Sequence, residues 1–65
     1  MTDYELLREL PLAARTIGVA EAQREAWRAA NNEQRDLTDD EFWAIALQAA
    51  REASKINGLG ASPPG

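Results

Sequence analysis

The chain contains no cysteine and no histidine among its 65 residues. Without cysteine it can form no disulfide, which argues against a disulfide-rich secreted scaffold. Without either residue type, the usual nucleophile and general-base arrangements of enzymes are missing, and only carboxylates could hold a metal ion. We therefore expect a protein that is not an enzyme, with no catalytic residues, no cofactor-binding residues and no metal ligands.

Long apolar runs are also absent, since none approaches the ~18 residues that a membrane-spanning helix requires. The first residues include Asp3, Glu5 and Glu9 and are unlike a signal peptide, so we expect a cytoplasmic protein with no membrane partner. The chain has seven basic and eleven acidic residues, which gives a net charge of −4. This balance works against non-specific binding to the nucleic-acid backbone, which depends on lysine and arginine.

Sixty-five residues allow a single domain, and a domain of this size buries only about 60% of the surface that its unfolded chain exposes. With disulfides excluded, association with a partner protein or a second copy is the expected source of extra stability. We assign residues 1–58 to one helical domain and residues 59–65, LGASPPG, to a flexible C-terminal tail. Abundant alanine, and arginine in place of lysine, favour a GC-rich bacterial or phage source.

The first half of the chain predicts two helices separated by a bend at Pro11. Thr2 and Glu5 form a capping pair for a short helix, which Pro11 interrupts because it disfavours helix at the residue before it. Residues 12 to 31 are mainly good helix formers, and this second helix either runs through Gly18 or breaks there. Five of its residues are roughly aligned on one apolar face: Ala13, Ile17, Ala20, Trp27 and Ala30.

The stretch from Thr38 to Gly58 predicts the longest helix. Thr38 and Glu41 are spaced as a capping box. The neighbouring acids therefore indicate a helix start rather than a metal or acid–base site. Gly58 can adopt the left-handed conformation that commonly ends a helix. Two adjacent apolar stripes follow, one of Phe42, Ile45, Ala46, Ala49, Ala53 and Ile56 and one of Trp43, Leu47 and Ala50.

These signals predict an all-α fold in which a short N-terminal helix accompanies an antiparallel hairpin of the two longer helices. A connection of about six residues would place Trp27 beside Phe42 and Trp43, so that both tryptophans share one aromatic cluster. The broad face of the last helix would then stay partly uncovered. Two copies of the chain could close a four-helix bundle over it.

Residues 14–28 also resemble the helix-turn-helix family of DNA-binding domains. Ala14 is followed four residues later by Gly18, and Trp27 lies nine residues beyond the glycine. The resemblance implies a turn at Gly18 and a recognition helix after it, although Arg24 stands where the family usually has a buried aliphatic residue. The resemblance makes a DNA-binding regulator the alternative to our main hypothesis.

That main hypothesis is a small non-enzymatic protein–protein interaction module, a bacterial or phage regulator, adaptor or assembly factor. It would present an apolar helix face to itself, as a homodimer, or to a partner protein. A mimic of DNA is a third hypothesis, but the acids are dispersed and interleaved with arginine. The residues that we expect to bind the partner are Trp27, Phe42, Trp43 and Leu47, with Arg24 and Arg28 at the rim.

Overall fold

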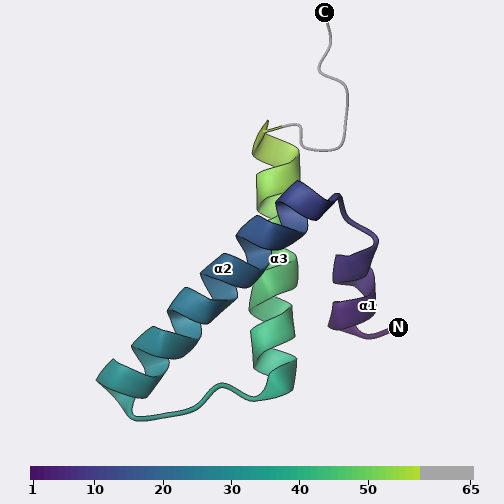
Figure 1. Cartoon of the computed structure of the whole chain (residues 1–65). Helices are drawn as coiled ribbons and strands as arrows, with labels where there is room; N and C mark the ends of the chain where they lie inside the picture. The colour runs from purple at the N-terminus through teal and green to yellow at the C-terminus, as the bar shows by residue number, and fades with distance from the viewer. Residues whose placement is uncertain (58–65) are drawn as a thin grey trace, which may run out of the picture.

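A computed structural model of the chain describes residues 1–57, which form three α-helices and one π-helical turn and contain no strand. The elements in chain order are α1 (Asp3–Arg8), α2 (Leu12–Arg28), η1 (Ala29–Glu33) and α3 (Asp39–Asn57). Figure 1 labels the three α-helices. The all-α prediction is confirmed. The predicted stop at Gly58 and the tail 59–65 lie outside the described residues, as does the side chain of Ile56.

The start of α1 and the bend after it follow the sequence signals. The Glu5 backbone N–H donates to the Thr2 hydroxyl at 3.2 Å, and the Thr2 backbone N–H donates to the Glu5 carboxylate at 3.0 Å. This reciprocal pair satisfies two N–H groups that the helix itself cannot pair. Pro11 precedes the first residue of α2, and its carbonyl accepts the Arg15 backbone N–H at 2.9 Å. The predicted bend at Pro11 is therefore confirmed.

The start of α3 uses the same device. The Thr38 backbone N–H donates to the Glu41 carboxylate at 3.0 Å, and the Glu41 backbone N–H donates to the Thr38 hydroxyl at 3.1 Å. Arg35 donates to both Glu41 carboxylate oxygens at 3.1 Å. The Thr38 backbone N–H, and after it the Arg35 guanidinium, holds the pKa of Glu41 below its ordinary value. The predicted helix cap at Thr38 and Glu41 is confirmed.

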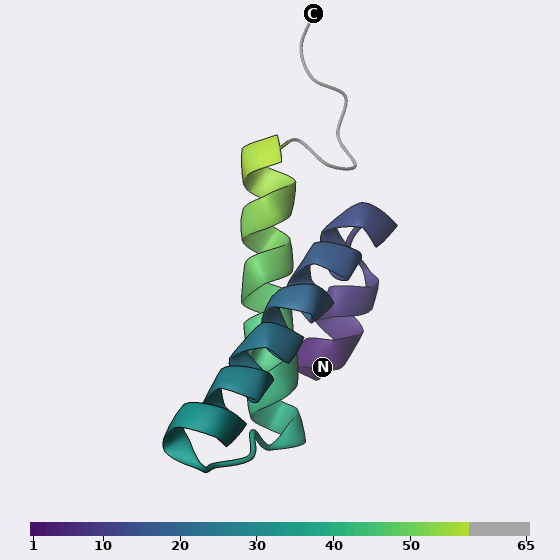
Figure 2. The same ribbon diagram turned by 60° about the vertical axis from the view of Figure 1, so that its left-hand side comes forward.

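The second helix runs unbroken through Gly18, which settles the choice between one helix and two. A Cβ atom built at Gly18 would lie 2.8 Å from the Ala50 Cβ and would collide with the Ala46 carbonyl oxygen. Glycine is therefore needed here because the backbones of α2 and α3 approach closely. The two helices run in opposite directions, cross near this contact and separate toward the segment that connects them (Figures 1 and 2).

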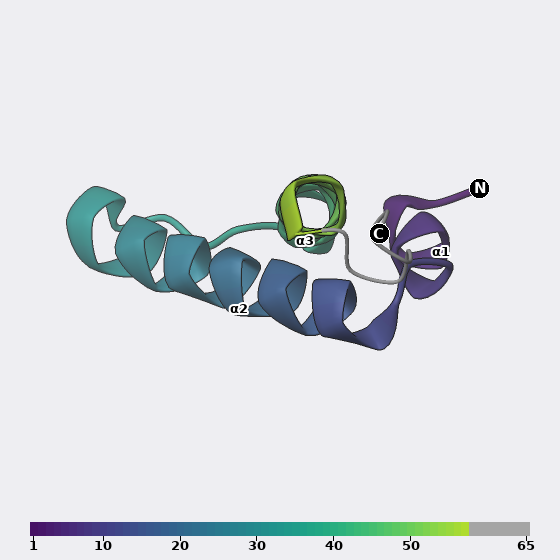
Figure 3. The same ribbon diagram turned by 90° about the horizontal axis from the view of Figure 1, so that it is seen from above.

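The core is built mainly from small side chains where these helices meet. Figure 3 shows α3 nearly end-on, with α2 running across it and α1 to one side. The α2 residues that face this core are Ala14, Gly18 and Ala22, spaced four apart. The buried cluster comprises Leu7, Ala14, Ala22, Ala46, Leu47 and Ala50.

The apolar face predicted for α2 is the opposite of the one that the fold buries. The five residues aligned on the predicted face are all exposed. The reason is steric: Gly18 permits the closest approach to α3, so the side of α2 that carries Ala14 and Ala22 turns inward. The two large residues of the predicted face, Ile17 and Trp27, therefore remain outside, together with Ala13, Ala20 and Ala30.

The aromatic residues are also arranged differently from the prediction. Trp43 contacts Tyr4 of α1, with ring centroids 4.7 Å apart, and Phe42, with ring centroids 5.0 Å apart. Trp27 is 68% exposed and makes no ring contact within residues 1–57. The predicted shared cluster of both tryptophans was wrong, because α2 and α3 separate toward the loop end where Trp27 lies.

Candidate functional site

Exposed large apolar side chains lie on the first half of the structure rather than on α3. Within residues 1–57, the large hydrophobic residues classed as exposed are Met1, Tyr4, Leu12, Ile17 and Trp27, and Leu12 and Trp27 reach 69% and 68% exposure. The sequence pattern instead predicts the uncovered face on the last helix. The first helix covers part of that face through Tyr4, so the uncovered apolar surface belongs mainly to α2.

The residues predicted to bind a partner are therefore divided between the core and the surface. Leu47 is 6% exposed and belongs to the buried core cluster. Phe42 and Trp43 are half-buried against that core. Trp27 is the predicted partner-binding apolar residue that stands fully on the surface, and the structure does not bring it together with the others.

The two arginines predicted at the rim are exposed, but each already forms an ion pair. Arg24 donates to Glu21 at 2.7 Å, and Arg28 donates to Glu25 at 2.8 Å. Both pairs have the i,i+3 spacing on one helix and contribute little to stability because they are solvated. Their charges are already balanced, so neither arginine offers a free cation to a partner.

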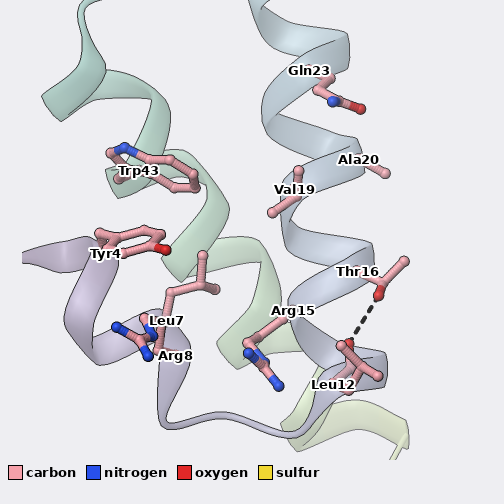
Figure 4. Close-up of a pocket in the computed structure, with 10 residues that line it drawn as sticks. All are labelled: Tyr4, Leu7, Arg8, Leu12, Arg15, Thr16, Val19, Ala20, Gln23 and Trp43. Carbon is pink, nitrogen blue, oxygen red and sulfur yellow. Dashed lines mark hydrogen bonds between the residues drawn. The ribbon is translucent and has the colours of Figure 1, made fainter.

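A groove that the sequence analysis missed lies between α1 and α2, with Trp43 of α3 on its lining (Figure 4). Its volume is about 460 Å³, within the range of about 300–1,000 Å³ that is usual for binding pockets. We call it the α1–α2 groove. Its lining residues are Tyr4, Leu7, Arg8, Leu12, Arg15, Thr16, Val19, Ala20, Gln23 and Trp43.

Two arginines give one end of this groove a positive charge. In Figure 4, Arg8 and Arg15 lie toward the end where the chain passes from α1 to α2, while Trp43 and Gln23 lie toward the other end. The Arg8 guanidinium carbon is 5.8 Å from the centroid of the Tyr4 ring, a cation–π distance. Within residues 1–57 neither arginine forms an ion pair, and the buried Nε of Arg15 has no hydrogen-bond partner. Arg8 also interacts electrostatically with Glu5, and both arginines lie on the lining of the groove.

The side of α2 that forms one wall of the groove continues past the groove as far as Trp27. Residues spaced three or four apart share one side of a helix, and Thr16, Ala20, Gln23 and Trp27 follow that spacing. The Thr16 hydroxyl already donates to the Leu12 carbonyl at 3.0 Å, so its polarity is satisfied locally. We call this surface the α2 stripe, and it consists of Leu12, Thr16, Ala20, Gln23 and Trp27.

The stripe carries no charged side chain, and its exposed anchors are apolar. Such a surface suits a packed helix better than a phosphate backbone, which would need free cations along its length. The unbroken helix through Gly18 also lacks the turn that the helix-turn-helix resemblance implied. Residues 14–28 are therefore one helix with an exposed outer side rather than two helices that cross.

Two sequence signals could have located the groove. A short helix that ends at Pro11 must fold back on the rest of a small chain, and Tyr4 is its aromatic residue. The glycine that permits close approach, together with alanines four residues to either side, marks the inner side of α2. The outer side, with Leu12 and Trp27, follows by elimination.

Comparison with protein-family models, with curated proteins and with solved structures gives no significant match. Within residues 1–57, none of the helices is both long enough and apolar enough to cross a membrane. The same part of the chain contains no group of three or more acidic side chains placed to hold a metal ion.

Proposed function

We propose that this protein is a small non-enzymatic interaction module that binds a protein, either another chain or its own copy, through the α2 stripe and the α1–α2 groove. The observation that carries the proposal is Trp27, a large side chain that is 68% exposed and continues the wall of an apolar groove. Tryptophan is among the residues most enriched at the energetic centres of protein interfaces. A cytoplasmic regulator, adaptor or assembly factor of a bacterium or phage would use such a surface.

The shape and chemistry of the surface favour a helical partner. The stripe extends over four turns of α2, and a second helix laid along it could bury Leu12 and Trp27 at once. A DNA-binding function receives less support, because Arg24 and Arg28 are engaged by glutamates and the chain carries a net charge of −4. DNA binding is therefore the alternative outcome of the test rather than a second proposal.

Affinity capture from the organism that encodes the protein tests the proposal when it compares variants. Trp27→Ala should lose the specifically bound protein, whether that protein is another chain or the untagged chain itself, while Gln48→Ala should retain it. Gln48 is a suitable control because it is exposed on α3 and lies outside the groove. Equal capture by the two variants would contradict the proposal. Capture of duplex DNA that weakens steeply with salt would support the alternative.

A further inference from the structure

The α2 stripe has a symmetry that points to a particular occupant. The midpoint between Leu12 and Trp27 falls between residues 19 and 20, and the midpoint between Thr16 and Gln23 falls at the same place. The stripe therefore has a large apolar residue at each end, an uncharged polar residue inside each end, and a small alanine, Ala20, beside its centre. A pattern that is symmetric about its midpoint is complementary to an antiparallel copy of itself.

We propose that the occupant of the α1–α2 groove is a second copy of this chain, with the two α2 helices paired antiparallel. This inference rests on the proposed function and names its partner. In this pairing, Leu12 lies level with the partner's Trp27, and the two Ala20 residues lie near the two-fold axis. Such an interface is isologous, since each chain contributes the same surface. Alanine at the centre permits helix axes to approach to about 8–10 Å.

The pairing brings an indole to each groove. Leu12 lines the groove together with Arg8 and Arg15, so the partner's Trp27 arrives at the end of the groove that carries these two cations. The groove of about 460 Å³ is large enough to receive an indole ring. Each chain thus completes the other's site, because the side chain that fills the groove comes from the partner.

The charges do not oppose this arrangement. An antiparallel partner brings the last turn of its α2 toward Arg8 and Arg15, and in that turn the charge of Arg28 is balanced by Glu25. The guanidinium groups can also lie against the face of the indole. The net charge of −4 on each chain opposes association in general, but the stripe itself contributes no repulsion because it is uncharged.

A single-cysteine experiment tests the geometry directly, since the natural chain has no cysteine. Ala20→Cys places one thiol of each chain near the two-fold axis. The two Cα atoms at position 20 can then come within the separation of about 4.4–6.8 Å that a disulfide requires. Under mild oxidation, purified Ala20→Cys should form a covalent dimer rapidly. Ala44→Cys is the matched control, because Ala44 is an exposed helical alanine on α3, and it should remain largely monomeric.

A second measurement keeps the inference testable if the cysteine alters folding. Sedimentation of the wild-type chain should show a monomer–dimer equilibrium, and Trp27→Ala should weaken it by at least about 30-fold, the loss expected at an interface hot spot. Circular dichroism confirms that each variant is helical. A wild-type chain that remains monomeric at all concentrations, or equal cross-linking of the two cysteine variants, would overturn the inference. If Trp27-dependent capture of a different protein persisted, the proposed function would survive; if that capture also failed, both would fall.

Discussion

Replacing Gly18 with alanine should destabilise the fold, although the same change stabilises most helices. In an exposed helix, alanine is favoured over glycine by roughly 0.5–1 kcal/mol. Here the added methyl group would lie 2.8 Å from the Ala50 Cβ and would collide with the Ala46 carbonyl oxygen. A backbone carbonyl cannot rotate aside as a side chain can, so α2 and α3 must move apart.

The size of the effect follows from these opposing contributions. Overpacking a core typically costs about 1–3 kcal/mol, and a collision with backbone belongs in the upper part of that range. Subtracting the gain in helix propensity leaves a net loss of about 1–2 kcal/mol. For a domain of this length, that loss lowers the melting temperature by roughly 5–15 °C. Since so small a core rarely supplies more than about 3–5 kcal/mol, the change is large.

Thermal and urea unfolding followed by circular dichroism measure this loss. Ala44→Gly is the companion variant, because Ala44 is exposed within α3 and its replacement reports helix propensity alone. A Gly18→Ala chain as stable as the wild type, or more stable, would refute the close helix contact and with it the inward orientation of Ala14 and Ala22.

Three further predictions concern the caps, the acid limit of stability and the core. Thr38→Ala should lose about 1 kcal/mol in urea unfolding, because the Glu41 backbone N–H loses its acceptor; an unchanged midpoint would contradict this. The pKa of Glu5 and of Glu41 is lowered on folding, from an ordinary value of 4.5, chiefly by hydrogen bonds from the Thr2 and Thr38 backbones respectively. The ionised carboxylates therefore stabilise the fold fully above that value, and this stabilisation is lost as pH falls through the lower folded pKa. In an acid titration, the free energy of unfolding of Glu41→Gln should therefore fall less steeply than that of the wild type between about pH 5 and about pH 3. Leu7→Ala should cost about 2–5 kcal/mol in thermal unfolding because Leu7 is 2% exposed, whereas Trp27→Ala should change the monomer by less than about 0.5 kcal/mol; similar losses would contradict these burial assignments.

Features that depend on neighbouring residues were predictable from the sequence. The capping boxes at Thr2 and Thr38 and the bend at Pro11 each depend on the identity of residues within about four positions. The Glu21–Arg24 and Glu25–Arg28 pairs likewise follow from i,i+3 spacing, and all of these are present. Local geometry is enough to specify such features, because no distant contact competes with them.

The orientation of α2 was not predictable in the same way. The helix carries small or apolar residues on several sides, and hydrophobic pattern favoured the side of Ile17 and Trp27. The fold instead buries the side on which Gly18 lies, because close backbone approach to Ala46 and Ala50 outweighs the size of the side chains. This one long-range contact moves Trp27 to the surface and separates it from Trp43.

The groove shared this dependence on tertiary structure. Its floor needs α1 to fold back so that Tyr4 reaches Trp43, and its other wall needs the outer side of α2. Neither condition is encoded in a spacing of three or four residues. The arginines of the groove, Arg8 and Arg15, are inconspicuous in the sequence because they lie seven positions apart on either side of a proline.

The central claim is that the α1–α2 groove and the α2 stripe bind protein, and photo-cross-linking in the native host tests it most directly. A photoreactive residue in place of Gln23, which lines the groove, should form a specific covalent adduct with a protein or with a second copy of the chain. The same residue in place of Gln48, an exposed glutamine of α3 outside the groove, should not. Adducts of equal yield at both positions, or none at Gln23 while the chain remains folded, would contradict the claim.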